Sequence, residues 1–299
     1  MKLAPPNNAK QNHSKQWSWV SIPDHQGVVH VGGRIGAAQG PQAAWALFQK
    51  MKGRSQVQET LSGVFTVNPI TTDVDKNHQA ATQWIADHAT QSAFTVIVGG
   101  GHDLGYPHLA GVQNALTQKL GRKARIGCIN LDAHLDVRKP SPLITSGSPF
   151  YLAIENGVLH PEDFIEFGIQ SHCNGAELWT YIEEKKVEVI GFAQLREAAV
   201  AFDAFKRCLS KLTQTCDGVV ISLDLDCIEQ GAAPGVSAPQ AEGFRPSNII
   251  RMLEQAGHES KVCSLGIFEL NPIFDRDAQT ARIAATAAWH FAEAKLNAP

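Results

Sequence analysis

The sequence predicts an α/β fold, specifically a three-layer α/β/α sandwich with a largely parallel central sheet. Short apolar runs alternate with longer amphipathic segments along the chain, which is typical of parallel strands joined by helices. The chain has 299 residues, 43% of them hydrophobic and 18% charged, enough for one large core. No internal repeat, linker or low-complexity run divides it. We therefore expect a polar N-terminal tail over residues 1–20 and a single domain over residues 21–299.

In the first half of the chain, β-branched apolar runs predict strands, and longer runs with apolar residues along one side predict helices. Strands are expected at residues 28–31, 64–67, 94–98 and 126–131. Helices are expected at 41–51, 78–89 and 106–120. Pro41 suits the first turn of its helix. The glycine-rich loop before it lacks the Lys-Ser/Thr ending of a phosphate-binding loop, so nucleotide binding is not expected.

The second half of the chain continues the same alternation. A segment rich in Pro, Ser and Thr at 138–149 predicts a loop, and Pro246 suits the first turn of another helix. Strands are expected at 164–169, 187–190, 218–223 and 262–268. Helices are expected at 150–155, 177–184, 196–212, 246–255 and 278–296.

One short polar motif follows the apolar run at 126–131. Asp132, His134 and Asp136 are two residues apart, so on an extended segment their side chains point the same way. Two carboxylates and an imidazole form a mixed oxygen and nitrogen site for a divalent cation. Taken alone, the motif is equally compatible with an ordinary polar loop.

Three other predicted strands end in polar or acidic residues of the same kind. His102 follows three glycines after one strand, Asp224 and Asp226 end a second, and Glu269 follows the last. Parallel strands deliver their carboxyl ends to one edge of a sheet, where open α/β folds place their sites. We therefore expect all of these side chains to share that edge.

The number of ligands indicates the kind of metal site. The four aspartates and two histidines of this set are too many ligands for one tetrahedral zinc ion. They fit two octahedral, oxygen-preferring ions that share bridging carboxylates, and Mn²⁺ suits this set. A hydroxide held between two such ions attacks substrates at neutral pH, so the residues predict a binuclear metal hydrolase.

The overall composition argues against other classes of partner. The net charge of −3 and the scattered basic residues give no reason to expect nucleic acid or a membrane surface as a partner. No apolar run approaches the length of a membrane span, and residues 1–16 lack the apolar stretch of a signal peptide. The six cysteines form no close pair and are expected to be reduced thiols in a cytoplasmic protein.

Three motifs resemble the signatures of the ureohydrolase (arginase/agmatinase) superfamily: 99–102 (Gly-Gly-Gly-His), 132–136 (Asp-Ala-His-Leu-Asp) and 222–226 (Ser-Leu-Asp-Leu-Asp). The resemblance extends from about residue 28 to the C-terminal helix. It implies an arginase-like fold, two Mn²⁺ ions per subunit, a small-molecule substrate and assembly into a homo-oligomer.

The same resemblance implies roles for the site residues. One ion would be held by His102, Asp132, Asp136 and Asp224, and the other by Asp132, His134, Asp224 and Asp226. Asp132 and Asp224 would then bridge the two ions. Glu269 matches the acid that holds the cationic nitrogen of the substrate, and it is expected to act in catalysis together with Asp136.

Several further segments resemble formimidoylglutamase more than arginase, namely 33–41, 136–138, 146–150, 233–239 and 269–272. Arginases carry a histidine near the position of Phe150 and an acid in the loop at 170–174, and this chain has neither. Formimidoylglutamate has two carboxylates and no free α-amino group, so its pocket needs cations and amide donors. Arg138 and Arg34 are the expected carboxylate partners. Gln170 and Asn174 are further substrate candidates, with loop capping as their alternative.

The expected reaction is hydrolysis of the formimidoyl C–N bond of N-formimidoyl-L-glutamate by a metal-bridging hydroxide, giving L-glutamate and formamide in histidine degradation. The nearest alternative is a guanidino-compound hydrolase, of agmatinase, guanidinobutyrase or arginase type, that releases urea. A metal-dependent phosphoesterase or deacetylase also uses Asp/His clusters, but the motif order and Glu269 argue against it. A non-enzymatic metal-binding regulator would be expected to lack a ligand, and here every ligand position is filled.

Overall fold

A single eight-stranded sheet forms the centre of the protein in the computed structural model, which describes residues 16–53 and 55–298. The strand order is β2-β1-β3-β8-β7-β4-β5-β6, and every neighbouring pair is parallel. The strands are β1 (Trp17–Ile22), β2 (Leu61–Thr66), β3 (Phe94–Gly99), β4 (Ile126–Leu131), β5 (Phe164–Ile169), β6 (Glu188–Gly191), β7 (Gly218–Asp224) and β8 (Val262–Phe268).

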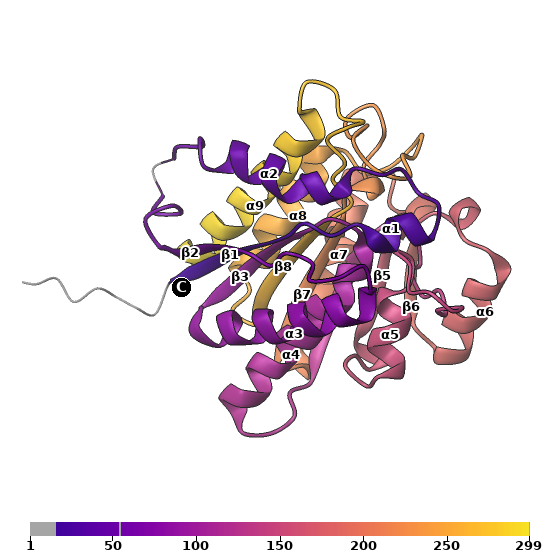
Figure 1. The fold of residues 1–299 in the computed structure, drawn as a ribbon, viewed down its shortest axis with the longest axis horizontal. Coiled ribbons are helices and arrows are strands. Elements are labelled where there is room, and N and C mark those ends of the chain that lie inside the picture. The colour runs from indigo at the N-terminus through magenta and orange to yellow at the C-terminus, as the bar shows by residue number, and fades with distance from the viewer. Residues whose placement is uncertain (1–15, 54, 299) are drawn as a thin grey trace, which may run out of the picture.

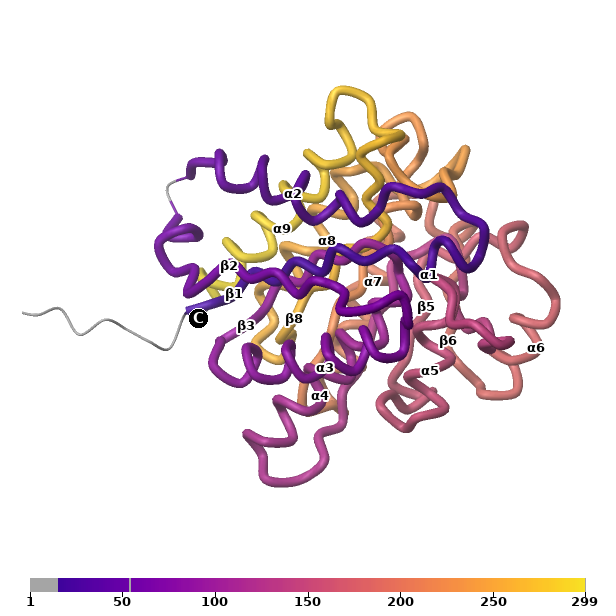
Figure 2. Tube along the Cα trace, in the orientation of Figure 1, coloured from indigo at the N-terminus to yellow at the C-terminus, as the bar shows by residue number. Residues whose placement is uncertain are grey.

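Helices cover both faces of the sheet, which makes three layers (Figure 1). Helices α2, α7, α8 and α9 pack on one face, and α3, α4, α5 and α6 pack on the other. Figure 2 shows α2, from early in the chain, running beside the C-terminal α9. The helices are α1 (Gln26–His30), α2 (Gly40–Phe48), α3 (Val74–Gln91), α4 (Gly105–Leu120), α5 (Pro149–Glu155), α6 (Ala176–Lys185), α7 (Ala198–Thr215), α8 (Pro246–His258) and α9 (Gln279–Asn297).

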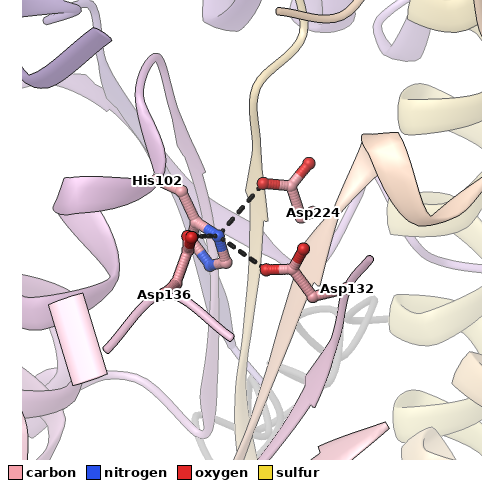
Figure 3. Close-up of side chains that lie close together, drawn as sticks. All are labelled: His102, Asp132, Asp136 and Asp224. Carbon is pink, nitrogen blue, oxygen red and sulfur yellow. Dashed lines mark ion pairs between the residues drawn. The ribbon is translucent and has the colours of Figure 1, made fainter. Parts of the chain in front are cut away.

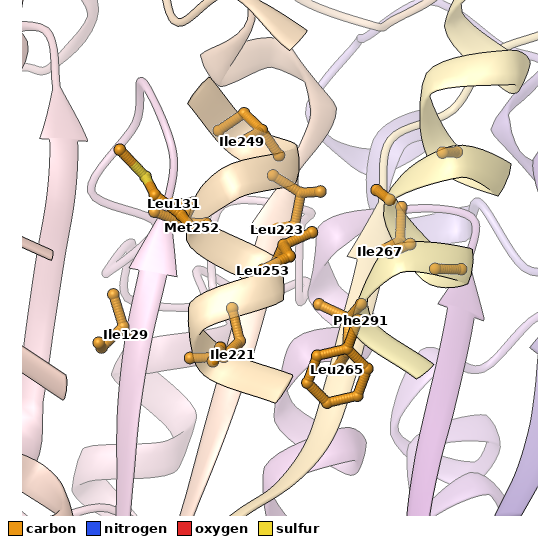
Figure 4. Packing of buried hydrophobic residues seen from close by; sticks show 14 of the residues in the cluster. Ile129, Leu131, Ile221, Leu223, Ile249, Met252, Leu253, Leu265, Ile267 and Phe291 are labelled. Carbon is orange, nitrogen blue, oxygen red and sulfur yellow. The ribbon is translucent and has the colours of Figure 1, made fainter. Parts of the chain in front are cut away.

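The core lies between the sheet and its helices, because alternate residues of each buried strand point to opposite faces. Leu223 of β7 and Leu265 of β8 are fully buried on the face covered by α8 and α9, where they pack near Leu253 and Phe291 (Figure 4). Val220 belongs to the cluster on the opposite face. Burial on both faces explains why these strands are continuous apolar runs in the sequence.

The four adjacent central strands carry the predicted site. In the order β3, β8, β7 and β4, their carboxyl ends lead into His102, Glu269, Asp224 and Asp132. Because all four strands are parallel, these residues emerge at the same edge of the sheet. The topology therefore brings together residues that are up to 167 positions apart in the sequence, as in the contact between His102 and Glu269.

Two sequence-based predictions about the start of the domain are wrong. Residues 28–31 are not a strand, because Gln26–His30 forms helix α1. The first strand is instead β1, Trp17–Ile22, so the predicted tail over residues 1–20 extends too far. In β1, Trp17 and Trp19 pack against Phe48 of α2. Because serines alternate with the tryptophans, this inner strand is not a continuous apolar run in the sequence. The part of the predicted tail at residues 1–15 lies outside the described residues.

The remaining expected strands and helices are confirmed, with ends shifted by a few residues. All six cysteines are free thiols. Among the described helices, none has both the length and the apolar character needed to cross a membrane.

Truncation of a core leucine should lower the free energy of unfolding far more than truncation of an exposed one. Leu265 in β8 is 0% exposed, so Leu265→Ala should lower the free energy of unfolding by about 2–5 kcal/mol, because it removes buried apolar surface and leaves a cavity. Leu143→Ala is the matched control, since Leu143 is 51% exposed and its loss should change stability by less than about 0.5 kcal/mol. Urea unfolding of both metal-free variants measures this, and equal losses would contradict the packing described here.

Candidate active site

The site is built where the chain turns sharply at the ends of central strands. After β3, Gly100 passes so close to the backbone of Asp24 that a Cβ atom at Gly100 would overlap the Asp24 carbonyl oxygen. The glycine therefore permits the tight packing that brings His102 to the sheet edge. Asp136 and Glu269 adopt positive φ angles of 44° and 65°. Such angles are uncommon for residues with side chains and occur often at functional sites.

His102 and three aspartates form the first cluster (Figure 3). The His102 Nδ1 atom lies 3.1 Å from Asp132 Oδ2, 2.9 Å from Asp136 Oδ2 and 3.0 Å from Asp224 Oδ2. The four ligand atoms all lie within 4.8 Å of one another, and the four residues are buried. Three elements of the chain thus aim one nitrogen and three oxygens at one point.

The chemistry of His102 fits a metal ligand. Its Nδ1 atom makes no hydrogen bond even though three carboxylate oxygens surround it. Its other ring nitrogen, Nε2, lies 2.8 Å from the Ser222 hydroxyl. If Nε2–H donates to Ser222, Nδ1 keeps its lone pair for a cation, which is the usual arrangement of a metal-bound histidine.

His134 belongs to the second cluster with Asp132 and Asp226. Its Nδ1 atom lies 3.0 Å from Asp226 Oδ2 and 3.6 Å from Asp132 Oδ1. Asp132 therefore presents Oδ2 to the first cluster and Oδ1 to the second, which suits a carboxylate that bridges two cations. Asp224 groups only with the first cluster, so its predicted role as a second bridge stays a prediction.

The carboxylates repel one another when no cation is present. Burial raises the pKa of Asp224 well above its ordinary range, and the negative charges of Asp226 and Asp132 raise it further. Burial also raises the pKa of Asp226 to about 6, although the neighbouring His134 acts in the opposite direction. Without a cation, the charged forms of these carboxylates are therefore disfavoured. A divalent cation among them would remove the repulsion.

The imidazole of His102 experiences the opposite influence. Burial by itself would lower the pKa of His102, but the carboxylates of Asp132, Asp136 and Asp224 raise it well above its ordinary value. For Asp132, burial alone would raise the pKa, but contacts with His102 and His134 hold it below the ordinary range. A positive charge at the centre of the cluster is thus strongly favoured, and the donor set suits a metal ion.

Glu269 stands beside the clusters with half of its carboxylate engaged. Its Oε1 atom accepts a 3.0 Å hydrogen bond from the backbone N–H of His102, while Oε2 has no partner among the described residues. Glu269 lines a cavity of about 260 Å³ together with His134, Asp136 and Arg138. The Oε2 atom is thus a buried, unpaired acceptor on a residue that forms part of the cavity wall.

The similarity of the chain to known proteins agrees with this geometry. A model of the arginase family matches residues 24–293, nearly the whole chain. The chain belongs to the arginase family. It is 30% identical over 269 residues to a formimidoylglutamase of Staphylococcus aureus, covering 89% of this chain and 82% of that protein.

Solved structures share the arginase-family fold with this chain. A formiminoglutamase from Trypanosoma cruzi with Mn²⁺ matches with a TM-score of 0.83 and 24% identity, covering 98% of this chain and 97% of that one. A formimidoylglutamase from Bacillus subtilis matches with a TM-score of 0.83 and 19% identity, covering 100% and 97%. The predicted arginase-like fold, the similarity to formimidoylglutamases and the class of hydrolase acting on amidino C–N bonds are confirmed.

The structure places only one of the four predicted substrate residues in the cavity of this arginase-family chain. Arg138 lines it and is exposed. Arg34 does not, because its guanidinium lies over the Phe274 ring, 4.9 Å from the ring centroid.

Gln170 and Asn174 instead bond to the backbone. Gln170 donates to the carbonyl of Glu242 at 2.8 Å, and Asn174 Oδ1 accepts from the N–H of Leu135 at 2.8 Å. Asn174 also donates to the carbonyls of Ala133 and Gln170, so it holds the loop that carries His134. These contacts favour the alternative of loop capping over direct substrate contact.

Three polar residues beneath the metal clusters were not found by the sequence analysis. Ser222, Asn130 and Glu166 lie on neighbouring strands, and Asn130 is in register with both of the others. Ser222 contacts His102, and Asn130 contacts Asp132. The available signal was a polar residue inside the apolar run of each strand, since a fully buried polar group normally has a specific partner.

Removal of Asp132, the shared ligand, should reduce stabilisation by Mn²⁺ more than removal of an unshared ligand. Mn²⁺ at about 100 times its dissociation constant should stabilise the protein by about 2.7 kcal/mol per site, which a thermal unfolding assay detects. Asp132→Asn should abolish nearly all of this stabilisation because Asp132 faces both clusters. Asp226→Asn is the matched comparison and should retain part of it. If the two variants behaved alike, Asp132 would not be the shared ligand.

Proposed function

We propose that the chain is a binuclear manganese formimidoylglutamase. It hydrolyses N-formimidoyl-L-glutamate to L-glutamate and formamide, a step of histidine degradation. The observation that carries the proposal is a complete set of His/Asp ligands beside one cavity, which is lined by His134, Asp136, Asp224 and Asp226 together with Glu269 and the exposed Arg138. The S. aureus relative, named a formimidoylglutamase, and the T. cruzi structure with Mn²⁺ support it.

The charges that line the cavity complement the two ends of this substrate. Its amidine end is cationic, and we propose that it donates an N–H to Glu269, which lines the cavity and whose Oε2 atom has no partner among the described residues. Its glutamate end is anionic, and among the described residues the Arg138 side chain has no ion pair of its own. A guanidinium binds a carboxylate through two parallel hydrogen bonds. No carboxylate lines the cavity except those of the metal clusters and Glu269, so the anionic end meets no further acid there.

Phe150 supports a substrate other than arginine within the same family. It is fully buried at the start of α5, and its ring packs edge-to-face on His102 with centroids 5.5 Å apart. This position, where arginases carry a histidine, supplies no titratable group to the reaction. Proton transfer must then rely on the acids at the clusters.

The metal ions and three residues of the chain have separate roles in the proposed reaction. When bound, the pair of Mn²⁺ ions supplies an activated water nucleophile at neutral pH and stabilises developing negative charge. Glu269 holds the amidine nitrogen and so orients the carbon that is attacked. Asp136, which lines the cavity, carries a proton to the nitrogen that departs with glutamate. Arg138 holds the glutamate end in place.

Two further properties are proposed with this function. We propose that the enzyme acts in the cytoplasm, which six free thiols support, and that it assembles into a homo-oligomer, as the resemblance to its superfamily implies. Light scattering of the purified protein tests the assembly directly, and a monomer would contradict it.

The experiment that tests the function compares substrates on one preparation. The purified Mn²⁺-loaded enzyme is given formimidoylglutamate, arginine, agmatine or guanidinobutyrate, and products are measured before and after chelation. We expect formamide and glutamate from the first substrate alone, with the activity lost on chelation. Urea from any other substrate would instead assign a guanidino hydrolase, and turnover that survived chelation would contradict the metal chemistry.

Arg138 should act in binding rather than in turnover. Arg138→Met should raise KM for formimidoylglutamate by about tenfold to a hundredfold, equivalent to the roughly 1.5–3 kcal/mol of a charge-assisted hydrogen bond, with a smaller effect on kcat. Lys139→Met is the matched control, because Lys139 is the adjacent exposed cation and does not line the cavity. If both variants raised KM equally, the effect would be general electrostatic attraction and not a contact made by Arg138.

A further inference from the structure

A buried carboxyl group is linked to the metal clusters by two hydrogen bonds through one intervening side chain. Glu166 of β5 and Asn130 of β4 are directly opposite each other across neighbouring strands. Both are 0% exposed. They interrupt strands that are otherwise almost entirely apolar. A charged or polar residue in such a place destabilises the fold unless it has a defined partner.

The Asn130 amide joins Glu166 to the shared metal ligand. Its Nδ2 atom donates to Asp132 Oδ2 at 3.0 Å and to Glu166 Oε2 at 3.0 Å. Asp132 Oδ2 is the same oxygen that lies 3.1 Å from His102 Nδ1 in the first cluster. Both N–H bonds of one amide are thus used, one on the ligand and one on the buried acid.

Glu166 has no cation to balance a negative charge. Within the described residues it forms no ion pair, and its single hydrogen bond is the one from Asn130. Burial raises the pKa of Glu166 well above its ordinary value, the bond from Asn130 acts against this, and the charge of Asp132 raises the pKa further. Glu166 is therefore a buried side chain that accepts one hydrogen bond, from Asn130, and has no cation beside it.

We propose that Glu166 and Asn130 are positioning residues for the metal centre: Glu166 orients the Asn130 amide, and that amide fixes the Asp132 carboxylate so that it faces both clusters. An asparagine amide has a donor end and an acceptor end, and the reversed orientation would turn its oxygen toward the Asp132 carboxylate. Glu166 selects the productive orientation because it accepts from the same NH₂ group. The inference rests on the metal site of the proposed function and identifies what holds its shared ligand.

The general behaviour of metal sites gives the size of the effect. Groups that hydrogen-bond to a metal ligand fix its orientation, and their loss typically lowers metal affinity by about 10–100-fold. Removal of the Glu166 acceptor should fall in this range. Replacement by glutamine should not, because the glutamine carbonyl oxygen can accept the same bond from Asn130.

The experiment measures Mn²⁺ affinity of metal-free variants by competition with a chelating dye, without any assay of turnover. Glu166→Met removes the acceptor at similar side-chain volume and should weaken binding by about 10–100-fold. Asn130→Leu removes the amide and should weaken it at least as much. Glu166→Gln should stay within about threefold of the original protein, because the rescue depends on the hydrogen bond and not on the charge.

Gln113→Met is the control for general loss of a buried polar group. Gln113 of α4 is 7% exposed and donates to the carbonyls of Ala124 and Val158, away from both clusters. This variant should lose some thermal stability but keep its Mn²⁺ affinity.

The outcomes separate this inference from the function on which it rests. If the unaltered protein bound no Mn²⁺, the metal site of the proposed function would be overturned, and the inference with it. If that protein bound Mn²⁺ and Glu166→Met bound it equally well, the positioning role alone would be overturned. Equal weakening in Glu166→Met and Gln113→Met, or no rescue by glutamine, would also overturn it.

Discussion

Mutual repulsion among four buried aspartates is the constraint on which the rest of the site depends. The ligand atoms of the first cluster lie within 4.8 Å of one another. Two unit charges about 4 Å apart interact by about 4 kcal/mol at an effective dielectric constant of 20. Burial and the neighbouring carboxylates raise the pKa values of Asp224 and Asp226, so their charged forms are disfavoured in the absence of a cation. Divalent cations relieve the repulsion with the carboxylates still charged, so the cluster is better matched to metal ions than to protons.

The sheet makes such a concentration of charge possible. Four adjacent parallel strands, β3, β8, β7 and β4, are buried on both faces and hold the site residues at one edge. The extensive apolar core supplies the stability that offsets the cost of the acidic cluster. Positive φ angles at Asp136 and Glu269 show that the backbone itself is bent to aim these two side chains. The same edge leaves a cavity in which charges of both signs face a small ligand.

Much of this was predictable from the sequence, because the information is local. Asp132, His134 and Asp136 could be grouped since a strand followed by alternating ligands needs no knowledge of distant contacts. The same logic found His102, Asp224, Asp226 and Glu269, and the parallel topology then brought them together. The motif-based resemblance supplied the family, which the match over residues 24–293 confirms.

Where the sequence analysis and the structure differ, the reason is contacts between residues that are far apart in the sequence. The apolar run at 28–31 forms a short helix, because the inner position in the sheet is taken by β1, whose Ser18 hydroxyl is hydrogen-bonded to those of Ser62 and Ser92. The role of Gln170 and Asn174 as substrate contacts stays a prediction, and their hydrogen bonds to backbone groups that the fold brings near favour the alternative of loop capping.

Asn130 and Glu166 escaped notice for a related reason. Each is a single polar residue in a buried strand, and its significance depends on which strand lies beside it. Strand order is set by contacts that are distant in sequence, and a single sequence does not display them. The layer of groups that supports a metal site is accordingly harder to predict than the ligands themselves.

Anomalous X-ray scattering from a crystal grown with Mn²⁺ would test the central claim most directly. We expect two manganese peaks per chain. One should lie at the point faced by His102, Asp132, Asp136 and Asp224, and the other between His134, Asp226 and the second oxygen of Asp132. Two peaks sharing Asp132 would establish that the fold gathers its acids to hold a pair of ions. The absence of manganese from this edge of the sheet, or a single ion that leaves His134 and Asp226 without metal, would contradict the account.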